Sequence, residues 1–161
     1  MFYKLIVLAS MFIFFGNSSK ENVRYYKEYY ETGKTKSEGW VKGGAKTGYW
    51  KFYHNNGNLA EKGHYKNGQR AEYWYFYSSN RVRSGEGHYS KGQKTDWWLY
   101  YDARGKLDYK CQLNVGKKDG YCIQYNNDNI SSAVKYTNGK KIKEWHDLRS
   151  FKRENKLSDL R

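Results

Sequence analysis

The chain has 161 residues, of which 38% are hydrophobic and 19% aromatic, with 30 Lys and Arg against 16 Asp and Glu. This length indicates one domain or one continuous array, and the aromatic content argues against disorder while the few aliphatic residues argue against a conventional aliphatic core. The net charge of +14 either favours anionic partners or serves solubility.

The N-terminus has the pattern of a secretory leader. Lys4 precedes an apolar run over residues 5–15, and Gly16-Asn17-Ser18 fits a small-x-small cleavage site. The apolar run is short for a membrane span. Residues 1–18 are therefore predicted to be a signal peptide, with an uncleaved anchor as the alternative. The remaining chain is expected to be secreted or periplasmic, or membrane-associated through this segment.

A 24-residue repeat dominates the rest of the sequence. Aromatic residues recur at this step as Tyr25, Tyr49, Tyr73, Trp97, Tyr121 and Trp145. The following position holds Tyr26, Trp50, Trp74 and Trp98, then Cys122. Glycines keep the same period at Gly44, Gly68, Gly92 and Gly116, with Gly139 one residue short; a second set, Gly33, Gly57 and Gly105, is replaced by Arg81 and Asn129 in two copies. About five copies are predicted between residues 25 and 144, within an array spanning 19–147.

Inside each copy the hydrophobic period is two, which predicts strands. Segments such as YWKFY and YWYFY are bounded by the turn signals NNGN and KNGQ. Asn-Gly favours a tight hairpin turn because both residues tolerate positive φ. Each copy is read as two antiparallel strands of about five to seven residues. The predicted fold is all-β, an elongated single-layer antiparallel β-meander built from about five 24-residue hairpin repeats.

Alternation along a strand places Tyr49 and Tyr53 on one face and Trp50 and Phe52 on the other. Aromatic cross-strand pairs contribute roughly 0.2–1 kcal/mol each, so most of these rings are expected to be scaffold that replaces a globular core. If one aromatic face binds a ligand, its candidate residues are Tyr53, Tyr77, Tyr101 and Tyr125, with Lys51 beside them.

The two cysteines and the tail leave alternatives open. Cys111 and Cys122 flank a predicted turn at 115–118, so they either face each other in a disulfide or remain free thiols, depending on strand register. Residues 148–161 are predicted to be a C-terminal cap or tail. They form either a degenerate half-repeat or a short amphipathic helix, since Leu148 and Phe151 lie three residues apart.

The repeat motifs resemble those of MORN-type repeat proteins, in the bacterial variant with a G-x-W-x-x-Y-x-x-(N/D)-G-x-L core. The match is close at GYWKFYHNNGNL (48–59), while DWWLYYDARGKL (96–107) lacks the leading glycine and GYCIQYNNDNI (120–130) lacks the tryptophan. The resemblance covers about three quarters of the chain. It implies an elongated sheet with one hairpin per repeat. Bacterial members are often labelled antitoxin-like, and eukaryotic relatives are linked to membrane attachment and dimerisation.

Catalytic and metal-binding patterns are weak in this sequence. The histidines His54, His64, His88 and His146 are accompanied by no Asp or Cys set with metal-ligand spacing. A single-layer sheet also offers no obvious cleft for paired catalytic carboxylates. The expectation is a non-enzymatic protein without cofactor or metal.

A binding role is therefore expected, with two classes of partner in view. The first is a protein, or a second copy of the chain, recruited by exposed aromatics and open sheet edges. The alternative is an anionic glycan or lipid of the cell envelope, recognised by Tyr, Trp, Lys and Arg. Interleaved basic and aromatic residues also occur in single-strand nucleic-acid binders, but the secretory leader and the evenly spread charge argue against that partner.

Overall fold

The computed structural model of the chain describes residues 22–160, so the predicted signal peptide at 1–18 lies outside the described residues. A sheet of 11 strands is followed by a short helix, α1 (Leu148–Lys152), and a 3-10 helix, η1 (Leu157–Leu160). The strands are β1 (Val23–Tyr29), β2 (Thr35–Lys42), β3 (Ala45–Tyr53), β4 (Leu59–Lys66), β5 (Gln69–Tyr77), β6 (Arg83–Ser90), β7 (Gln93–Tyr101), β8 (Leu107–Asn114), β9 (Lys117–Asn126), β10 (Asn129–Thr137) and β11 (Lys140–Trp145).

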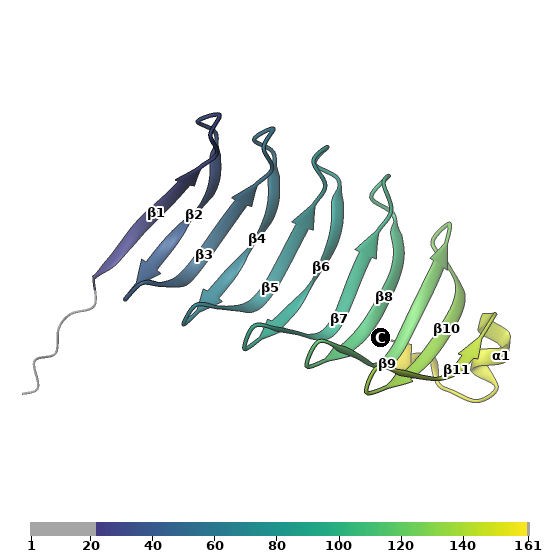
Figure 1. Cartoon of the computed structure of the whole chain (residues 1–161). Helices are drawn as coiled ribbons and strands as arrows, with labels where there is room; N and C mark the ends of the chain where they lie inside the picture. Colours follow the sequence, from purple (N-terminus) through teal and green to yellow (C-terminus); the bar gives the residue numbers. More distant parts are fainter. Residues whose placement is uncertain (1–21, 161) are drawn as a thin grey trace, which may run out of the picture.

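Each strand pairs with its neighbours in the sequence, so the sheet runs from β1 to β11 in order (Figure 1). All pairs are antiparallel, which confirms the predicted meander of consecutive hairpins. Strands β2 to β8 have eight or nine residues each, more than the five to seven expected. The turns use few residues, so most residues of each repeat lie in strands that pair with their neighbours.

Two kinds of turn alternate along the array. Turns that lead from an even-numbered strand to the next strand have two residues, as at Asn67 (φ 51°) and Gly68 (φ 76°). Positive φ at both positions suits the right-handed twist of the flanking strands. On the opposite side the turns are longer, and Gly57 has positive φ while Asn56 does not. The tight-turn expectation for Asn-Gly thus holds at one of these two dipeptides.

The second glycine set is replaced in two different ways. Arg81 adopts the glycine-like conformation itself, with φ of 69°. The turn between β9 and β10 is shortened to Asn127 and Asp128, which both have positive φ. Asn129 therefore begins β10. The sequence repeat predicted that it would replace a turn glycine, and that prediction is wrong.

Hydrogen bonds between successive two-residue turns hold the repeats in register. The N–H of Gly68 donates to the carbonyl of Lys46 at 2.9 Å. The same bond recurs one repeat further on from Gly92 to Arg70 and from Gly116 to Lys94. Gly139 makes it with Lys118 at 2.7 Å, although Gly139 falls one residue short of the sequence period.

A ladder of three tryptophans forms much of the core on one side of the sheet. Trp50, Trp74 and Trp98 are almost completely buried. Each ring lies on a glycine of the preceding strand: a Cβ atom at Gly63 would lie 2.3 Å from Cδ2 of Trp74, and the equivalent contacts occur at Gly39 and Gly87. Because glycine leaves the strand surface flat, the indole rings rest directly on backbone, which compensates for the lack of a second layer.

The indole nitrogens are also satisfied in a repeated way. Nε1 of Trp50 donates to the carbonyl of Trp40 at 2.9 Å, and Nε1 of Trp74 donates to that of His64 at 3.1 Å. Nε1 of Trp98 donates to the carbonyl of His88 at 3.0 Å. The polar atom of each of these three rings is therefore paired, as burial favours.

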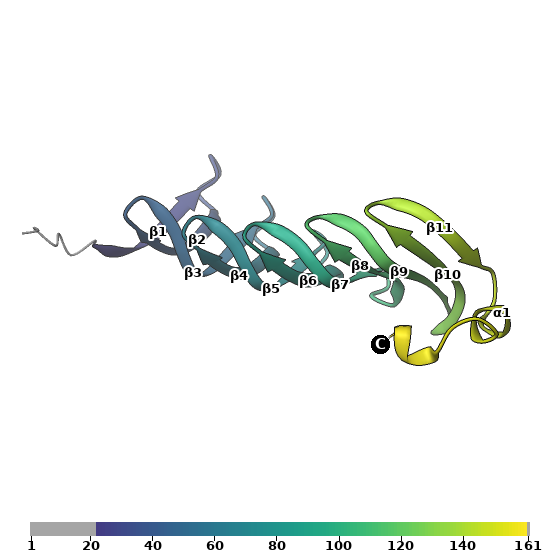
Figure 2. The same cartoon turned by 90° about the horizontal axis from the view of Figure 1, so that it is seen from below.

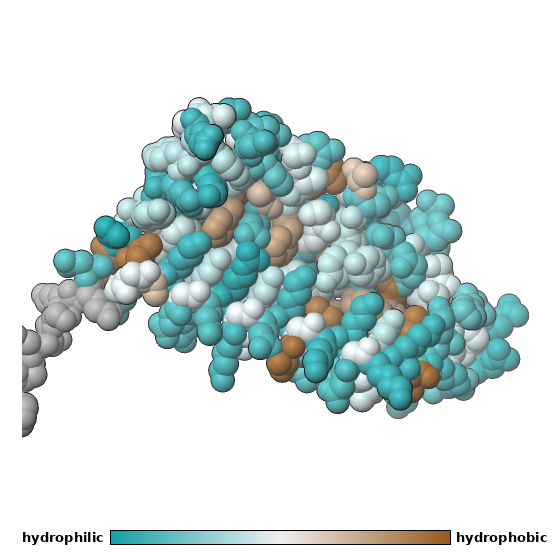
Figure 3. Space-filling view, viewed as in Figure 1, coloured by the Kyte–Doolittle hydropathy of each residue, from teal (hydrophilic) through white to brown (hydrophobic). Residues whose placement is uncertain are grey.

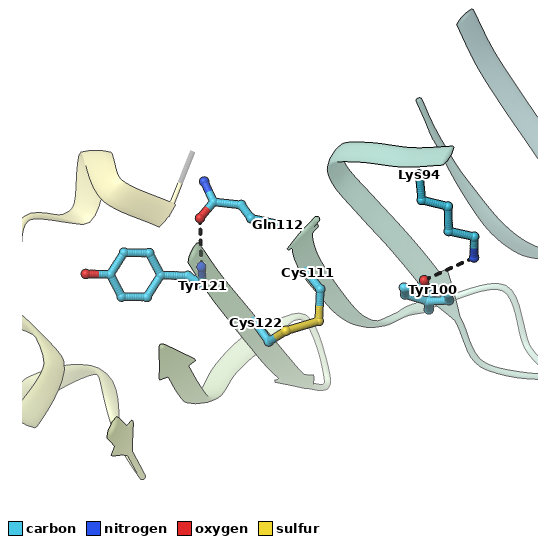
Figure 4. Close-up of a disulfide and its surroundings, with 6 residues drawn as sticks. All are labelled: Lys94, Tyr100, Cys111, Gln112, Tyr121 and Cys122. Atoms are coloured by element: carbon cyan, nitrogen blue, oxygen red, sulfur yellow. Dashed lines mark hydrogen bonds between the residues drawn. A yellow bond between two sulfur atoms is a disulfide. The ribbon is translucent and has the colours of Figure 1, made fainter. Parts of the chain in front are cut away.

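A disulfide takes the place of the next glycine–tryptophan pair. Cys111 follows Gly87 by 24 residues, and Cys122 follows Trp98 by the same step. The two cysteines face each other across β8 and β9 and are bonded through their sulfur atoms (Figure 4). The sequence did not decide between a disulfide and free thiols. The observed strand register places Cys111 opposite Cys122, and the disulfide forms.

The tail folds back alongside the last strands (Figure 2). It packs on the face that carries Tyr121, which alternation places opposite the tryptophan ladder. Helix α1 begins after Asp147, whose carboxylate accepts the N–H of Ser150 at 2.7 Å. Phe151 and Leu160 are buried against Tyr121, Ile123 and Trp145 in one hydrophobic cluster. The tail over residues 148–160 therefore forms two short helices, α1 and η1, and not a half-repeat strand pair.

Candidate functional site

The two faces of the sheet differ in how their aromatic residues are covered. The tryptophan face carries Trp50, Trp74 and Trp98, with Phe52, Tyr65, Phe76, Tyr89 and Tyr100 packed around them. The tyrosine face carries the opposite side chains of the same strands, among them Tyr25, Tyr49, Tyr73, Trp97 and Tyr121. The candidate binding residues predicted from the sequence all lie on the tyrosine face.

Two of those predicted tyrosines bind carboxylates within the array. The hydroxyl of Tyr53 donates to Glu38 at 2.7 Å, and the hydroxyl of Tyr101 donates to Glu86, which is buried. The hydrogen bond from Tyr53, followed by Lys27, holds the pKa of Glu38 below its usual value against the opposing effect of burial. Burial and Glu86 raise the pKa of Tyr101 to about 12. Both hydroxyls are thus already used within the fold.

The other predicted residues have different surroundings. Tyr77 is half-buried, with Lys62 Nζ 6.0 Å from its ring centroid. Tyr125 packs against the C-terminal hydrophobic cluster, and burial raises its pKa. Lys51 is exposed and lies opposite Glu38 and Lys62 in the register. The structure thus places the five residues on one face, but it does not bring them together as one uniform surface.

Edge-on ring pairs recur on the tyrosine face, and one of their members, Trp40, was not predicted from the sequence. Tyr49 packs against His64 with centroids 5.0 Å apart, and Tyr73 packs against His88 at 4.7 Å. One repeat earlier, Tyr25 packs in the same manner against Trp40 at 5.1 Å. Trp40 occupies the repeat position of the two histidines, and this shared position is the signal that could have identified it.

Exposure of the tyrosine face falls along the array. Tyr25 is 48% exposed and Tyr49 is 38% exposed, whereas Tyr121, under the C-terminal helices, is 8% exposed. Trp40, between the first two, is 45% exposed. We call Tyr25, Trp40 and Tyr49 the N-terminal aromatic patch. All three belong to the exposed large hydrophobic residues of the described chain.

The patch adjoins an open sheet edge. Within residues 22–160, β1 pairs with β2 alone, and nearly all of its side chains are exposed. An edge strand presents unpaired N–H and C=O groups that a further strand can bond. Two ion pairs lie nearby: Lys27 lies 3.2 Å from Glu38, and Lys36 lies 2.8 Å from Glu28. The open edge and the aromatic rings therefore form one continuous surface at this end.

A column of cations lies over the rings of the tryptophan face. Lys46, Arg70, Lys94 and Lys118 recur every 24 residues. Lys46 Nζ lies 4.6 Å from the Trp50 centroid, and Lys94 Nζ lies 3.9 Å from that of Trp98. Burial lowers the pKa of both lysines. Arg70 lies over Trp74 at 4.3 Å and is paired with Glu61 at 2.6 Å.

The surface as a whole is polar. In the view of Figure 3 teal and white residues predominate and brown patches are small, partly because Tyr and Trp rank near the middle of that hydropathy scale. No group of three His, Cys, Asp or Glu side chains among residues 22–160 is arranged to hold a metal ion. Neither of the two short helices in that range is long and apolar enough to cross a bilayer.

Over residues 22–160, these features define a class of protein: a single-sheet β-hairpin repeat with a buried tryptophan ladder and an aromatic end whose outer strand pairs on one side only. Comparison with protein-family models and with curated protein sequences finds no match for the chain.

Proposed function

We propose that this is a non-enzymatic binding protein that recruits a protein partner at its N-terminal end. The observation that carries the proposal is the exposure of Tyr25, Trp40 and Tyr49 beside the open edge of β1, while the equivalent Tyr121 is covered. Tyrosine and tryptophan dominate binding hot spots because they bury large, rigid surfaces at little entropic cost.

The mode of binding that this end favours is strand addition. An extended partner segment would bond to the N–H and C=O groups of β1 that no strand of residues 22–160 pairs, and it would gain affinity from the main chain. Its alternate side chains would lie over Tyr25 and Trp40 on the tyrosine face, which supplies specificity. A second copy of this chain is one such partner, and a foreign protein is another.

The sequence resemblance to MORN-type repeats supports the same proposal. Repeat proteins generally act by presenting an extended surface, and the antitoxin-like label of bacterial members points to a protein target. The disulfide between Cys111 and Cys122 supports the proposed secreted or periplasmic location, because disulfides persist in oxidising compartments.

The test is capture of a protein by the mature chain from extracts of its own cells, with Trp40→His as the key variant. Histidine stands at the equivalent positions 64 and 88, so the fold should tolerate it. Loss of a hot-spot tryptophan should weaken capture by about tenfold or more. The matched control is Ile142→Ser, which removes an exposed apolar residue at the opposite end of the array. Equal capture by Trp40→His and the unchanged chain would refute the proposal.

The cation column favours a second candidate, an anionic glycan or lipid of the cell envelope. Lys46 and Lys94 are cationic groups set against aromatic rings, a combination suited to an acidic sugar or a phosphate. Such binding should weaken strongly between 0.01 M and 1 M salt, where the Debye length falls from roughly 30 Å to roughly 3 Å. Binding through Trp40 should persist at high salt.

A further inference from the structure

A hollow lies on the tryptophan face at the disulfide, where the ladder would place its fourth indole ring. It has a volume of about 310 Å³, at the lower end of the range for small-molecule pockets. Its lining includes Tyr109, Cys111, Lys118, Cys122, Val134 and Tyr136. In the three preceding repeats the corresponding space is filled by Trp50, Trp74 and Trp98.

The surroundings of an indole ring are retained around this hollow. Lys118 stands at the repeat position of Lys46, Arg70 and Lys94, which lie 3.9–4.6 Å from the ring centroids of their tryptophans. Tyr136 stands where Tyr65 and Tyr89 meet Trp50 and Trp74 edge-on, with centroids 6.0 and 5.9 Å apart. The disulfide forms the floor in place of glycine, and sulfur makes favourable contacts with aromatic rings.

The charge of the hollow favours an anion. Lys118 is exposed, and no carboxylate of residues 22–160 lies within ion-pair distance of its Nζ, which sits 4.9 Å from the Tyr136 centroid. Glu144 also borders the hollow, but its carboxylate is bonded to Lys141, which holds the pKa of Glu144 below its usual value. A ligand carboxylate could therefore pair with Lys118 without displacing an internal partner.

We propose that this hollow binds a small aromatic acid, with the planar ring in the vacant indole position and the carboxylate on Lys118. The site lies on the face opposite the N-terminal aromatic patch and near the other end of the array, so it is independent of the protein-binding site proposed above. Figure 4 shows the disulfide between β8 and β9, with Lys94 and Tyr100 on the neighbouring strand β7.

The test uses indole-3-acetate as the probe, with binding followed by backbone amide shifts of the oxidised protein. Saturable shifts are expected at Cys122, Val134 and Tyr136, with a dissociation constant on the order of 1 mM for a ligand of this size. Tryptamine, which has the same ring and a positive charge, should bind at least tenfold more weakly. Cyclohexylacetate, which lacks the aromatic ring, should also bind more weakly.

Two variants decide whether the probe occupies the vacant position. Cys111→Gly combined with Cys122→Trp rebuilds the glycine–tryptophan pair of the other repeats and should abolish binding. Val134→Trp fills the hollow without removing the disulfide. It replaces the double variant in this test if the double variant does not fold. Lys118→Met should weaken binding about tenfold, whereas Lys117→Met, at the neighbouring exposed position of β9, should leave it unchanged.

The proposal is overturned if indole-3-acetate gives no saturable shifts, or if a folded variant with a filled hollow binds as well as the unchanged chain. Shifts that map to the N-terminal aromatic patch instead would also overturn it. Because the protein-partner test depends on Trp40 and this one on the hollow, either can fail without the other.

Discussion

At the C-terminal end Phe151 and Leu160 cover Tyr121, whereas at the N-terminal end the equivalent Tyr25 packs edge-on against Trp40 and remains half-exposed. The edge strands differ too. β11 carries three lysines, Lys140, Lys141 and Lys143, and lysine discourages pairing with another chain, while β1 carries one lysine and a pair of adjacent tyrosines.

This difference shows that the repeat unit does not determine its own exposure. The same sequence position is buried at one end of the array and open at the other, depending on whether a neighbouring segment covers it. In a repeat protein each unit contacts its neighbours, so terminal units need a cap to remain soluble. One end has such a cap in α1 and η1, and the open end is where we propose that the partner acts.

The largest effect is expected from breaking the ladder under its central tryptophan. In Gly63→Ala the new Cβ would lie 2.3 Å from Trp74, so the ring must leave its buried position, at a cost of about 3 kcal/mol in the free energy of unfolding. Urea unfolding followed by tryptophan fluorescence measures it. Gly85→Ala is the control, because its Cβ would meet nothing closer than 3.4 Å; a similar loss in both variants would contradict the role of the ladder.

Reduction of the disulfide tests the other half of the array. The bond closes a short loop between Cys111 and Cys122, which are 11 residues apart, and its loss should cost up to about 3 kcal/mol. The effect should be local, so amide exchange should accelerate in β8–β10 and remain slow in β3–β6. Uniform acceleration along the whole sheet would show that the array unfolds as one unit and that its two halves are not distinct.

A smaller effect, of opposite sign, is expected at the turn between β8 and β9. Val115 has φ of 50°, a left-handed conformation that is strained for a β-branched residue. Asn67 and Asn138 occupy the equivalent positions in other turns. Val115→Asn should therefore stabilise the protein by about 1 kcal/mol, measured by thermal unfolding. Asn67→Val should cost a similar amount, and no loss there would argue against strain as the cause.

A further effect should appear only at high pH and should come from the half-buried part of the sheet. Burial raises the pKa values of Tyr73, Tyr100 and Tyr101 to about 12. Since the folded state holds these protons after the unfolded state has lost them, stability should fall as the pH rises from about 10 to about 12. Absorbance of the phenolate, recorded with and without denaturant, follows this titration. Tyr101→Phe should reduce the pH dependence, and an unchanged slope would contradict the assignment.

Much of the fold could be predicted because the turn residues and the alternation of side chains indicate the same hairpin in most copies of the repeat. Asn67-Gly68 specified its tight turn, and period-two alternation separated Tyr49 from Trp50. Asn56-Gly57 misled because the same dipeptide also fits a longer turn with only the glycine in the left-handed region. The candidate site was harder to predict: Tyr53 and Tyr101 were proposed from their period, but Glu38 and Glu86, which bind their hydroxyls, lie 15 residues away.

The 24-residue period and the turn residues act over short distances, so they were enough to specify the strand architecture. Which aromatic residues are open depends on how distant segments pack. The tail covers Tyr121, no residue of the described chain pairs with the outer edge of β1, and Cys122 in place of tryptophan leaves a hollow. These outcomes depend on contacts between segments far apart in the chain, so they cannot be read from a repeat pattern that treats every copy alike.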